Sequence, residues 1–262
     1  MAAKSTNIKV DVSDHVATVT LDRPPVNAVD RPTFDELRDA FTSFNQSRDV
    51  RVAIFTAAGE RAFMAGVDLR AVDDAPVDPP PSRITDPGSA AREAMWSITD
   101  CAVPVIGAIN GPALGAGLAF AACCDILIAA DNATFGTTEI NVGLLGASAH
   151  LSMLVGRHKA REMFFTGEVV SADELYRLGA LRAVVPHAGL MDAARELASS
   201  LAAKSPIALR LAKEAMNRVE HLPLKDAYRT EQEYTARLQR FEDAQEARQA
   251  YLEKRDPDWK WR

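Results

Sequence analysis

Two short apolar runs in the first half of the chain constrain its fold most strongly, because each is suited to a strand buried on both faces. They are Val52–Ala57 (VAIFTA) and residues 103–109 (VPVIGAI), and each is followed closely by a segment rich in glycine and alanine. Continuous apolar runs of this length are typical of parallel strands that helices cover on both sides. Helix-like sequence between such strands predicts an α/β architecture with short crossover connections.

Four further segments of the first half fit or interrupt this alternation. Val16–Leu21 (VATVTL) alternates with the period of a strand, and residues 125–130 (DILIAA) form another apolar run. Residues 31–45 carry phenylalanine and leucine at helical spacing. Residues 73–89 are acidic and rich in proline, with too few apolar side chains to bury, so we expect a surface loop that is either a lid or an inert linker.

The last third of the chain has a different texture, with helical spacing and few β-branched residues. We expect helices at residues 190–203, at Pro206–Val219 and along one long charged run from residue 224 to residue 255. The predicted organisation is a catalytic core over residues 1–190 and a helical region over residues 191–262. Such a helical tail either packs against a neighbouring subunit or folds back on its own domain.

Composition narrows the function classes. The 262 residues carry a formal net charge of -6, which disfavours nucleic acid as a partner because phosphate backbones bind basic surfaces. The three cysteines include an adjacent pair and form no CxxC motif, which indicates reduced thiols and a cytoplasmic protein. The first ten residues, MAAKSTNIKV, lack the apolar region of a secretory signal, and we expect no membrane partner.

Three segments carry features that chemistry can use. Residues 59–69 (GERAFMAGVDL) and 110–119 (NGPALGAGLA) each follow a predicted strand and place small residues where a ligand can approach the backbone. The second would also open a helix, whose first N–H groups are unpaired. Residues 135–146 (FGTTEINVGLLG) place Glu139 among apolar neighbours. Taken singly, each is more often a turn, a packing site or a solvent-facing glutamate; it is their order after matching strands that indicates function.

In this order the segments resemble the crotonase superfamily, the enoyl-CoA hydratase/isomerase family. The resemblance covers nearly the whole chain, and its most specific parts are VATVTLDRPPVNAV, RAFMAGVDL, VPVIGAINGPALGAGLAFAACCDILIA, ATFGTTEINVGLLG, FFTGEVVSADELYRLGALRAVVP and the closing EKRDPDWKWR. It implies a core of stacked β-β-α turns with C-terminal helices that form a trimer or a dimer of trimers. It also implies an acyl-CoA substrate with no separate cofactor, since coenzyme A is part of the substrate.

The resemblance also implies site residues. The backbone N–H groups of Val67 and Ala116 would form an oxyanion hole, although the family usually has glycine at the position of Ala116. Contacts to coenzyme A would come from two groups of residues near the start of the chain and around the hole, Val26, Ala28, Ala65, Gly66, Asp68 and Leu69. Three C-terminal residues, Lys254, Trp259 and Lys260, would reach the nucleotide of a neighbouring subunit; the family often has phenylalanine at the position of Trp259.

The reaction depends on which carboxylates are present. Hydratases of the family use two glutamates, and this chain has Glu139 at one position but Ala119 at the other. Two carboxylates orient and deprotonate a water, whereas one is sufficient to move a proton between carbons, as an isomerase does. Apolar neighbours would raise the pKa of Glu139, which suits a group that alternates between base and acid.

A second departure from the family lies just beyond Glu139. The chain has LLGASAHL where the family often has IPGAGGTQRL, so a glycine loop that helps to hold the hydratase water is altered. The shorter segment brings His150 into this neighbourhood, either as a substitute polar group or as an ordinary structural histidine.

Several alternatives stay open beside a hydratase or an enoyl-CoA isomerase. They are a specialised decarboxylase, hydrolase or dehalogenase of the same family, and a non-catalytic acyl-CoA-binding homologue, for which Ala119 is the best indication. RNA binding is disfavoured by the acidic composition. Metal catalysis is not expected because the five histidines lack ligand spacing, and no GxSxG motif indicates a Ser/His/Asp hydrolase.

Overall fold

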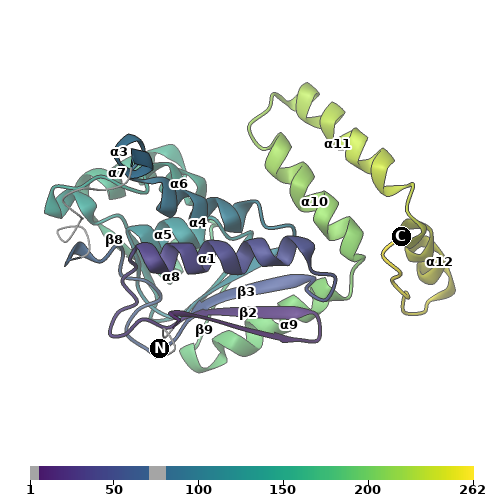
Figure 1. Cartoon of the computed structure of the whole chain (residues 1–262), viewed down its shortest axis with the longest axis horizontal. Coiled ribbons are helices and arrows are strands. Elements are labelled where there is room, and N and C mark those ends of the chain that lie inside the picture. Colours follow the sequence, from purple (N-terminus) through teal and green to yellow (C-terminus); the bar gives the residue numbers. More distant parts are fainter. Residues whose placement is uncertain (1–5, 71–80) are drawn as a thin grey trace.

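The computed structural model describes residues 6–70 and 81–262 and has a six-stranded sheet at its centre (Figure 1). Only the first pair of strands is antiparallel; the other neighbours run parallel. In spatial order the strands are β1 (Ile8–Ser13), β2 (Val16–Leu21), β3 (Val52–Ala57), β4 (Val105–Ile109), β6 (Ile126–Ala130) and β9 (Ala183–Val185). This is the α/β architecture that the apolar runs predict.

Helices cover both faces of this sheet, which explains why β3 is buried along its whole length. Helices α1 (Arg31–Ser43) and α4 (Ser89–Thr99) pack against each other and belong to the cluster on one face, whereas α9 (Leu190–Ala202) packs on the other. Along β3 the side chains alternate, so that Phe55 faces the α1 side and Ile54 faces α9. The core therefore has two apolar layers with the sheet between them.

Aromatic packing in the α1 layer fixes the two segments that follow β3 and β4. The ring of Phe55 lies 5.1 Å from Phe63 and 6.3 Å from Phe120, measured between centroids. Phe120 also stacks on Phe34 of α1 at 6.0 Å. Because Phe63 lies in the loop after β3 and Phe120 lies in the helix after β4, one buried cluster positions both segments.

A smaller sheet of three strands connects the segment after β4 with two later parts of the chain. Its strand order is β5 (Ala113–Leu114), β7 (Thr134–Gly136) and β8 (Val169–Ser171). The remaining helices of the core, including the short 3-10 helices, are η1 (Phe44–Gln46), α3 (Pro81–Thr85), α5 (Ala116–Ala122), η2 (Glu139–Val142), α6 (Ser148–Leu154), α7 (Arg157–Thr166), α8 (Ala172–Arg177) and η3 (His187–Gly189).

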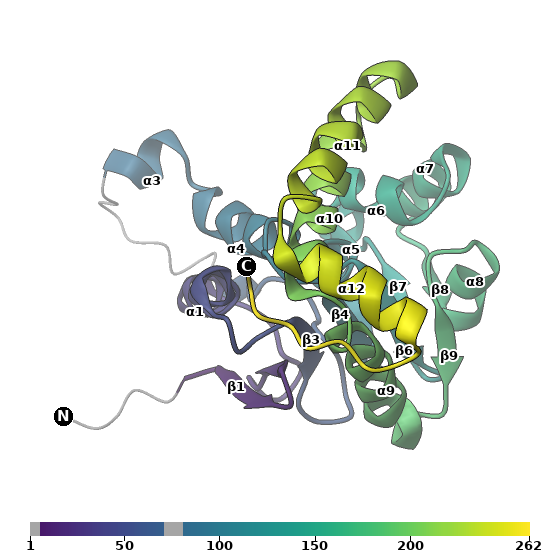
Figure 2. The same ribbon diagram turned by 90° about the vertical axis from the view of Figure 1, so that its right-hand side faces the viewer.

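The C-terminal helices form an arm that extends from the core (Figures 1 and 2). They are α10 (Pro206–Val219), α11 (Leu224–Leu238) and α12 (Glu242–Glu253). An ion pair between the buried Lys213 and the partly exposed Asp125 anchors the arm: Lys213 of α10 lies 2.7 Å from Asp125 and also donates to the carbonyl oxygens of Ile98 and Val103. Lys213 is only 5% exposed. Its ammonium group has three acceptors, so its charge is buried with a partner.

The structure corrects some of the sequence-based boundaries. The predicted single helix over residues 224–255 is wrong, because the chain breaks between Leu238 and Glu242 into α11 and α12. Of the predicted loop at residues 73–89, residues 73–80 lie outside the described residues, and Pro81–Thr85 is helical rather than a loop. No helix within residues 6–70 and 81–262 has the length and apolar character needed to cross a bilayer.

Candidate active site

The two glycine-containing segments lie side by side. The N–H groups of Phe63 and Met64 both point to Pro112 O, at 3.1 and 3.2 Å, and Leu114 N donates back to Met64 O at 3.0 Å. A methyl group on Gly117 would lie 2.1 Å from Met64 O, so only glycine allows the start of α5 to approach the segment around Met64 so closely. The segments 59–69 and 110–119, which each follow a strand in the sequence, are therefore in direct contact in the fold.

Hydrogen bonds on either side of Val67 leave its own N–H group free. Val29 N donates to Gly66 O at 2.9 Å, and Asp68 N donates to Val29 O at 2.8 Å. In such a parallel bridge the N–H group of the residue between the two bonds points to the opposite side. Arg23 links the segments that carry Val29 and Val67, because its Nη2 atom lies 3.0 Å from Asp30 Oδ2 and 2.9 Å from Asp68 Oδ2.

The second free N–H group belongs to Ala116, the first residue of α5. The preceding Gly115 has φ 55° and ψ -115°, a conformation that favours glycine, and its N–H donates to Gly136 O at 2.9 Å. Within residues 6–70 and 81–262, neither Val67 N–H nor Ala116 N–H donates to a protein acceptor. Both residues line one cavity, so the predicted pair of donors is brought together.

The cavity has a volume of about 490 Å³ and is bounded by small residues on the side of the donors. Its other wall comes from η2, the following loop and α6, and Met95 of α4 closes one side. The lining residues are Ala65, Gly66, Val67, Leu69, Met95, Gly115, Ala116, Ala119, Thr138, Glu139, Asn141, Val142, Leu144, Leu145, Gly146, Ala147 and His150. Sequence reasoning missed Met95, which carries no local signal because α4 contributes it from a distant part of the chain.

Glu139 is the one carboxylate among the described residues that line this cavity. A methyl group on Gly115 would lie 2.9 Å from Glu139 Oε1, and one on Gly146 would lie 2.8 Å from the same atom. Its Oε2 atom is buried with no hydrogen-bond partner, and burial raises the pKa of the carboxyl group above its usual value. The carboxylate is thus held against the turn that carries the Ala116 N–H group.

The position of Ala119 is equally informative. Its methyl group is 1% exposed and lines the same cavity from α5. His150, on the first turn of α6, lines the same cavity, and burial lowers the pKa of its imidazole. The site therefore combines one carboxyl group, one imidazole and two free backbone donors in largely apolar surroundings.

The predicted coenzyme A contacts fall into three places. Ala65, Gly66 and Leu69 line the cavity itself. Val26, Ala28 and Asp68 line an adjoining hollow of about 480 Å³, together with Arg23, Pro24, Pro25 and Arg70.

Lys254, Trp259 and Lys260 follow α12, and α12 and the C-terminus lie at the opposite end of the molecule from α6 and α7 (Figure 1). Trp259 Nε1 donates to Ala203 O at 3.1 Å, and Lys260 N donates to Asp243 Oδ1 at 2.8 Å. These three residues are not brought to the cavity of their own chain, so their contact with a neighbour's nucleotide stays a prediction.

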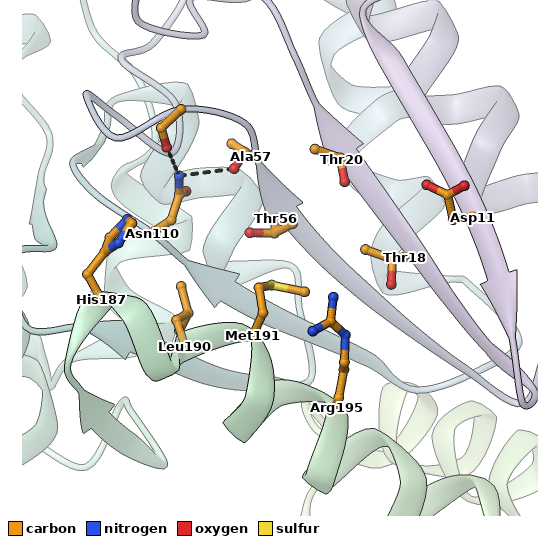
Figure 3. Close-up of a pocket in the computed structure, with 11 residues that line it drawn as sticks. Asp11, Thr18, Thr20, Thr56, Ala57, Asn110, His187, Leu190, Met191 and Arg195 are labelled. Atoms are coloured by element: carbon orange, nitrogen blue, oxygen red, sulfur yellow. Dashed lines mark hydrogen bonds between the residues drawn. The ribbon is translucent and has the colours of Figure 1, made fainter.

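A second cavity of about 500 Å³ lies between β1, β2 and α9, and we call it the α9 trough (Figure 3). In this view Thr18 and Thr20 of β2 lie opposite Met191 and Arg195 of α9. Its lining residues are Asp11, Thr18, Thr20, Thr56, Ala57, Gly59, Asn110, His187, Leu190, Met191 and Arg195. Neither Val67 nor Ala116 is among the described residues that line it, so it does not contain their two free N–H groups.

Comparison with known proteins agrees with this geometry. The family model described as enoyl-CoA hydratase/isomerase matches residues 11–262. The enoyl-CoA hydratase of Bacillus anthracis superimposes with a TM-score of 0.91 at 34% identity, covering 98% of this chain and 100% of that one. Human enoyl coenzyme A hydratase domain-containing protein 3 gives a TM-score of 0.89 at 29% identity, with 97% and 100% coverage.

Two curated relatives have more specialised names. A (7aS)-7a-methyl-1,5-dioxo-2,3,5,6,7,7a-hexahydro-1H-indene-carboxyl-CoA hydrolase of Rhodococcus jostii is 36% identical over 244 residues, 93% of each chain. A carnitinyl-CoA dehydratase of Salmonella enteritidis is 37% identical over 255 residues, 94% of this chain and 95% of the relative. Fold and site define a crotonase-type enzyme. The chain belongs to the enoyl-CoA hydratase/isomerase family, which confirms the resemblance drawn from its motifs.

Proposed function

We propose that this enzyme acts on acyl-CoA thioesters and holds the oxygen of a thioester enolate between Val67 N–H and Ala116 N–H. The observation that carries the proposal is the placement of Glu139 against Gly115, beside one of the two free donors. Removing a proton next to a thioester carbonyl puts negative charge on its oxygen. Donors already held in place stabilise that charge without reorganisation, and each is typically worth a factor of about a hundred or more in rate.

Binding energy would come from the coenzyme A moiety, away from the reacting carbons. We assign the hollow around Val26, Ala28 and Asp68 to this moiety, because Asp68, which lines it, directly follows Val67. In an oligomer, Lys254, Trp259 and Lys260 of another subunit would complete the nucleotide contacts. Light scattering tests the trimer or dimer of trimers on which this assignment depends.

The reaction best supported by one carboxylate is migration of a double bond. Glu139, ionised, removes a proton from C2 of a 3-enoyl-CoA, and the electron pair of that C–H bond delocalises into a dienolate. The protonated carboxyl group then returns the proton to C4, which gives the conjugated 2-enoyl-CoA and restores the carboxylate. The raised pKa of Glu139 suits both steps, because the same group acts first as base and then as acid.

A water-dependent reaction is the second candidate, and the named relatives favour it. One is called a hydrolase and the other a dehydratase, and both are at least 36% identical to this chain. Water addition through Glu139 alone would have to proceed without the second glutamate, since Ala119 has no acid or base. Two other functions are compatible with this fold. One is decarboxylation of an acyl-CoA, and the other is acyl-CoA binding without catalysis.

A paired assay separates these candidates. The purified protein is given crotonyl-CoA and, separately, a 3-enoyl-CoA, and the absorbance of the conjugated thioester is followed. We expect absorbance to appear from the 3-enoyl-CoA and to persist with crotonyl-CoA. Rapid loss from crotonyl-CoA would replace isomerisation by hydration, and silence in both assays with acyl-CoA still bound would indicate another reaction or none.

Ala119→Glu is the matched variant for this assay. It restores a carboxylate at the position where hydratases of the family have one, and we expect hydration of crotonyl-CoA to rise by about tenfold or more. If hydration stays at the wild-type level while the variant still folds and binds acyl-CoA, Ala119 is not what limits hydration.

A further inference from the structure

The outer wall of the active-site cavity is mainly apolar, with one imidazole among its members. Val142, Leu144 and Leu145 line it and remain 59%, 42% and 77% exposed, so this side is open to an acyl group. His150 stands in the same wall on the first turn of α6, and it is half-buried. His150 lines the same cavity as Val67, Ala116 and Glu139, so an acyl group that fills this cavity would contact the ring.

The hydrogen bonds of the structure give His150 no role in holding the fold. Throughout residues 6–70 and 81–262, its ring makes no hydrogen bond with another residue, whereas Asn110, Lys213 and Asp243 each engage several backbone groups. Its pKa is lowered by burial, so the ring is neutral at neutral pH. A neutral imidazole offers one donor nitrogen and one acceptor nitrogen.

The consequence for a ligand depends on what the acyl group carries. A plain alkyl chain would displace water from His150 and leave its ring nitrogens unpaired, which is unfavourable in apolar surroundings. A hydroxyl group can donate to the acceptor nitrogen or accept from the donor, and a keto oxygen can accept from the donor. The wall therefore favours an acyl group with an oxygen in addition to the thioester carbonyl.

We propose that His150 is a specificity-determining residue that selects acyl-CoA thioesters whose acyl group carries a hydroxyl or keto substituent. The inference rests on the proposed function, because it requires the acyl group to occupy this cavity. Glu139 and the two backbone donors act on the thioester end, and His150 acts on the substituent.

The test compares binding of butyryl-CoA and 3-hydroxybutyryl-CoA, which differ by one hydroxyl group. The Glu139→Gln variant is used as background so that neither ligand is converted during calorimetry. We expect the hydroxyacyl ligand to bind about tenfold more tightly, the size of one well-placed hydrogen bond. Adding His150→Leu should abolish this ratio while butyryl-CoA binds as before or more tightly.

Two further variants separate recognition from structural damage. His150→Gln keeps a donor and an acceptor and should retain most of the preference. His158→Leu changes an exposed histidine on α7 that is not among the described lining residues, and it should leave the ratio unchanged.

Equal affinity of the two ligands for the background protein would overturn the inference, as would a preference that survives His150→Leu. Those results leave acyl-CoA binding intact and so leave the proposed function standing. If neither ligand binds the background protein, the proposed function fails and the inference fails with it.

Discussion

The active-site cavity and the α9 trough have nearly equal volumes, about 490 and 500 Å³, but they differ in what their polar groups do. In the trough, Thr56 Oγ1 donates to Ala108 O at 2.9 Å, and Asn110 Nδ2 donates to Ala57 O and Gly59 O at 3.0 and 2.8 Å. These bonds join the ends of β3 and β4. The polar groups of the trough mostly hold the sheet together.

In the active-site cavity the polar groups are held in place but left unpaired. Val67 N–H and Ala116 N–H donate to no described protein group, and Glu139 Oε2 is buried without a partner. The trough also has unpaired atoms, Asn110 Oδ1 and His187 Nε2, but its charged residues Asp11 and Arg195 are exposed to water, which screens them. Under the proposed function, the two cavities differ in their prearranged backbone donors beside a buried carboxylate oxygen, and not in their volume.

The largest effect that tests this contrast is expected from Glu139→Gln. The amide keeps the shape of the side chain but cannot carry the proton, so turnover should fall by about a thousandfold. Steady-state kinetics with the best substrate of the paired assay measures the loss. Acyl-CoA affinity, measured by calorimetry, should change little; unchanged turnover would remove Glu139 from the mechanism.

Gly117→Ala should give the next largest effect. The added methyl group would lie 2.1 Å from Met64 O, so α5 and the segment that runs from Met64 to Val67 must separate. Misplacing the two donors should lower kcat about a hundredfold, and the strain should cost about 2 kcal/mol of unfolding free energy. Kinetics and chemical denaturation measure the two effects.

Gly189→Ala is the matched control for that change. A methyl group there meets nothing within 4 Å, and the backbone angles are ordinary for any residue. Activity should stay within about twofold of wild type. If Gly117→Ala behaves like this control, close approach of the two segments is not needed for catalysis.

A smaller effect concerns stability and pH. The folded-state pKa of Glu139 is raised above 4.5, so its contribution to stability is fully present below pH 4.5 and is lost as the pH rises through the folded-state value. Glu139→Gln lacks this dependence. The Tm of wild type relative to that of the variant should therefore fall between pH 4 and pH 7, and a difference that does not change with pH would contradict the raised pKa.

The sequence was sufficient for the parts of the fold that apolar runs determine. VAIFTA and DILIAA predicted β3 and β6 because a strand buried on both faces is apolar along its length. β1 was missed because only its first residue is buried, and β7, β8 and β9 were missed because each has three residues and depends on its partner strand. Short strands of this kind carry too little local signal.

The break between α11 and α12 shows a second limit. No proline or glycine marks it in the sequence. The side chain of Asp243, 1% exposed, accepts from Lys260 N at 2.8 Å and from Trp261 N at 3.0 Å, so the end of the chain closes on the start of α12. A contact between residues 17 or 18 positions apart leaves no periodic pattern, which is why one long helix was expected.

For the site, the family resemblance named Val67, Ala116 and Glu139, and the structure places all three on one cavity. The apolar outer wall was not predicted as a surface, since η2, α4 and α6 form it only after the core has assembled. His150 was placed in the neighbourhood but could not be given a role without its half-burial and its missing partners.

The smallest effect should come from Thr20→Val in the α9 trough. Thr20 pairs with Thr56 in the register of β2 and β3, and valine matches its shape and favours strands. Because the proposed chemistry lies in the other cavity, kcat/KM should stay within about twofold of wild type, and unfolding free energy within about 1 kcal/mol. A loss of activity above tenfold in a stable Thr20→Val protein would mean that the trough communicates with the oxyanion donors. The path would then run through Asn110, which binds the loop after β3 and directly precedes the segment that ends at Ala116.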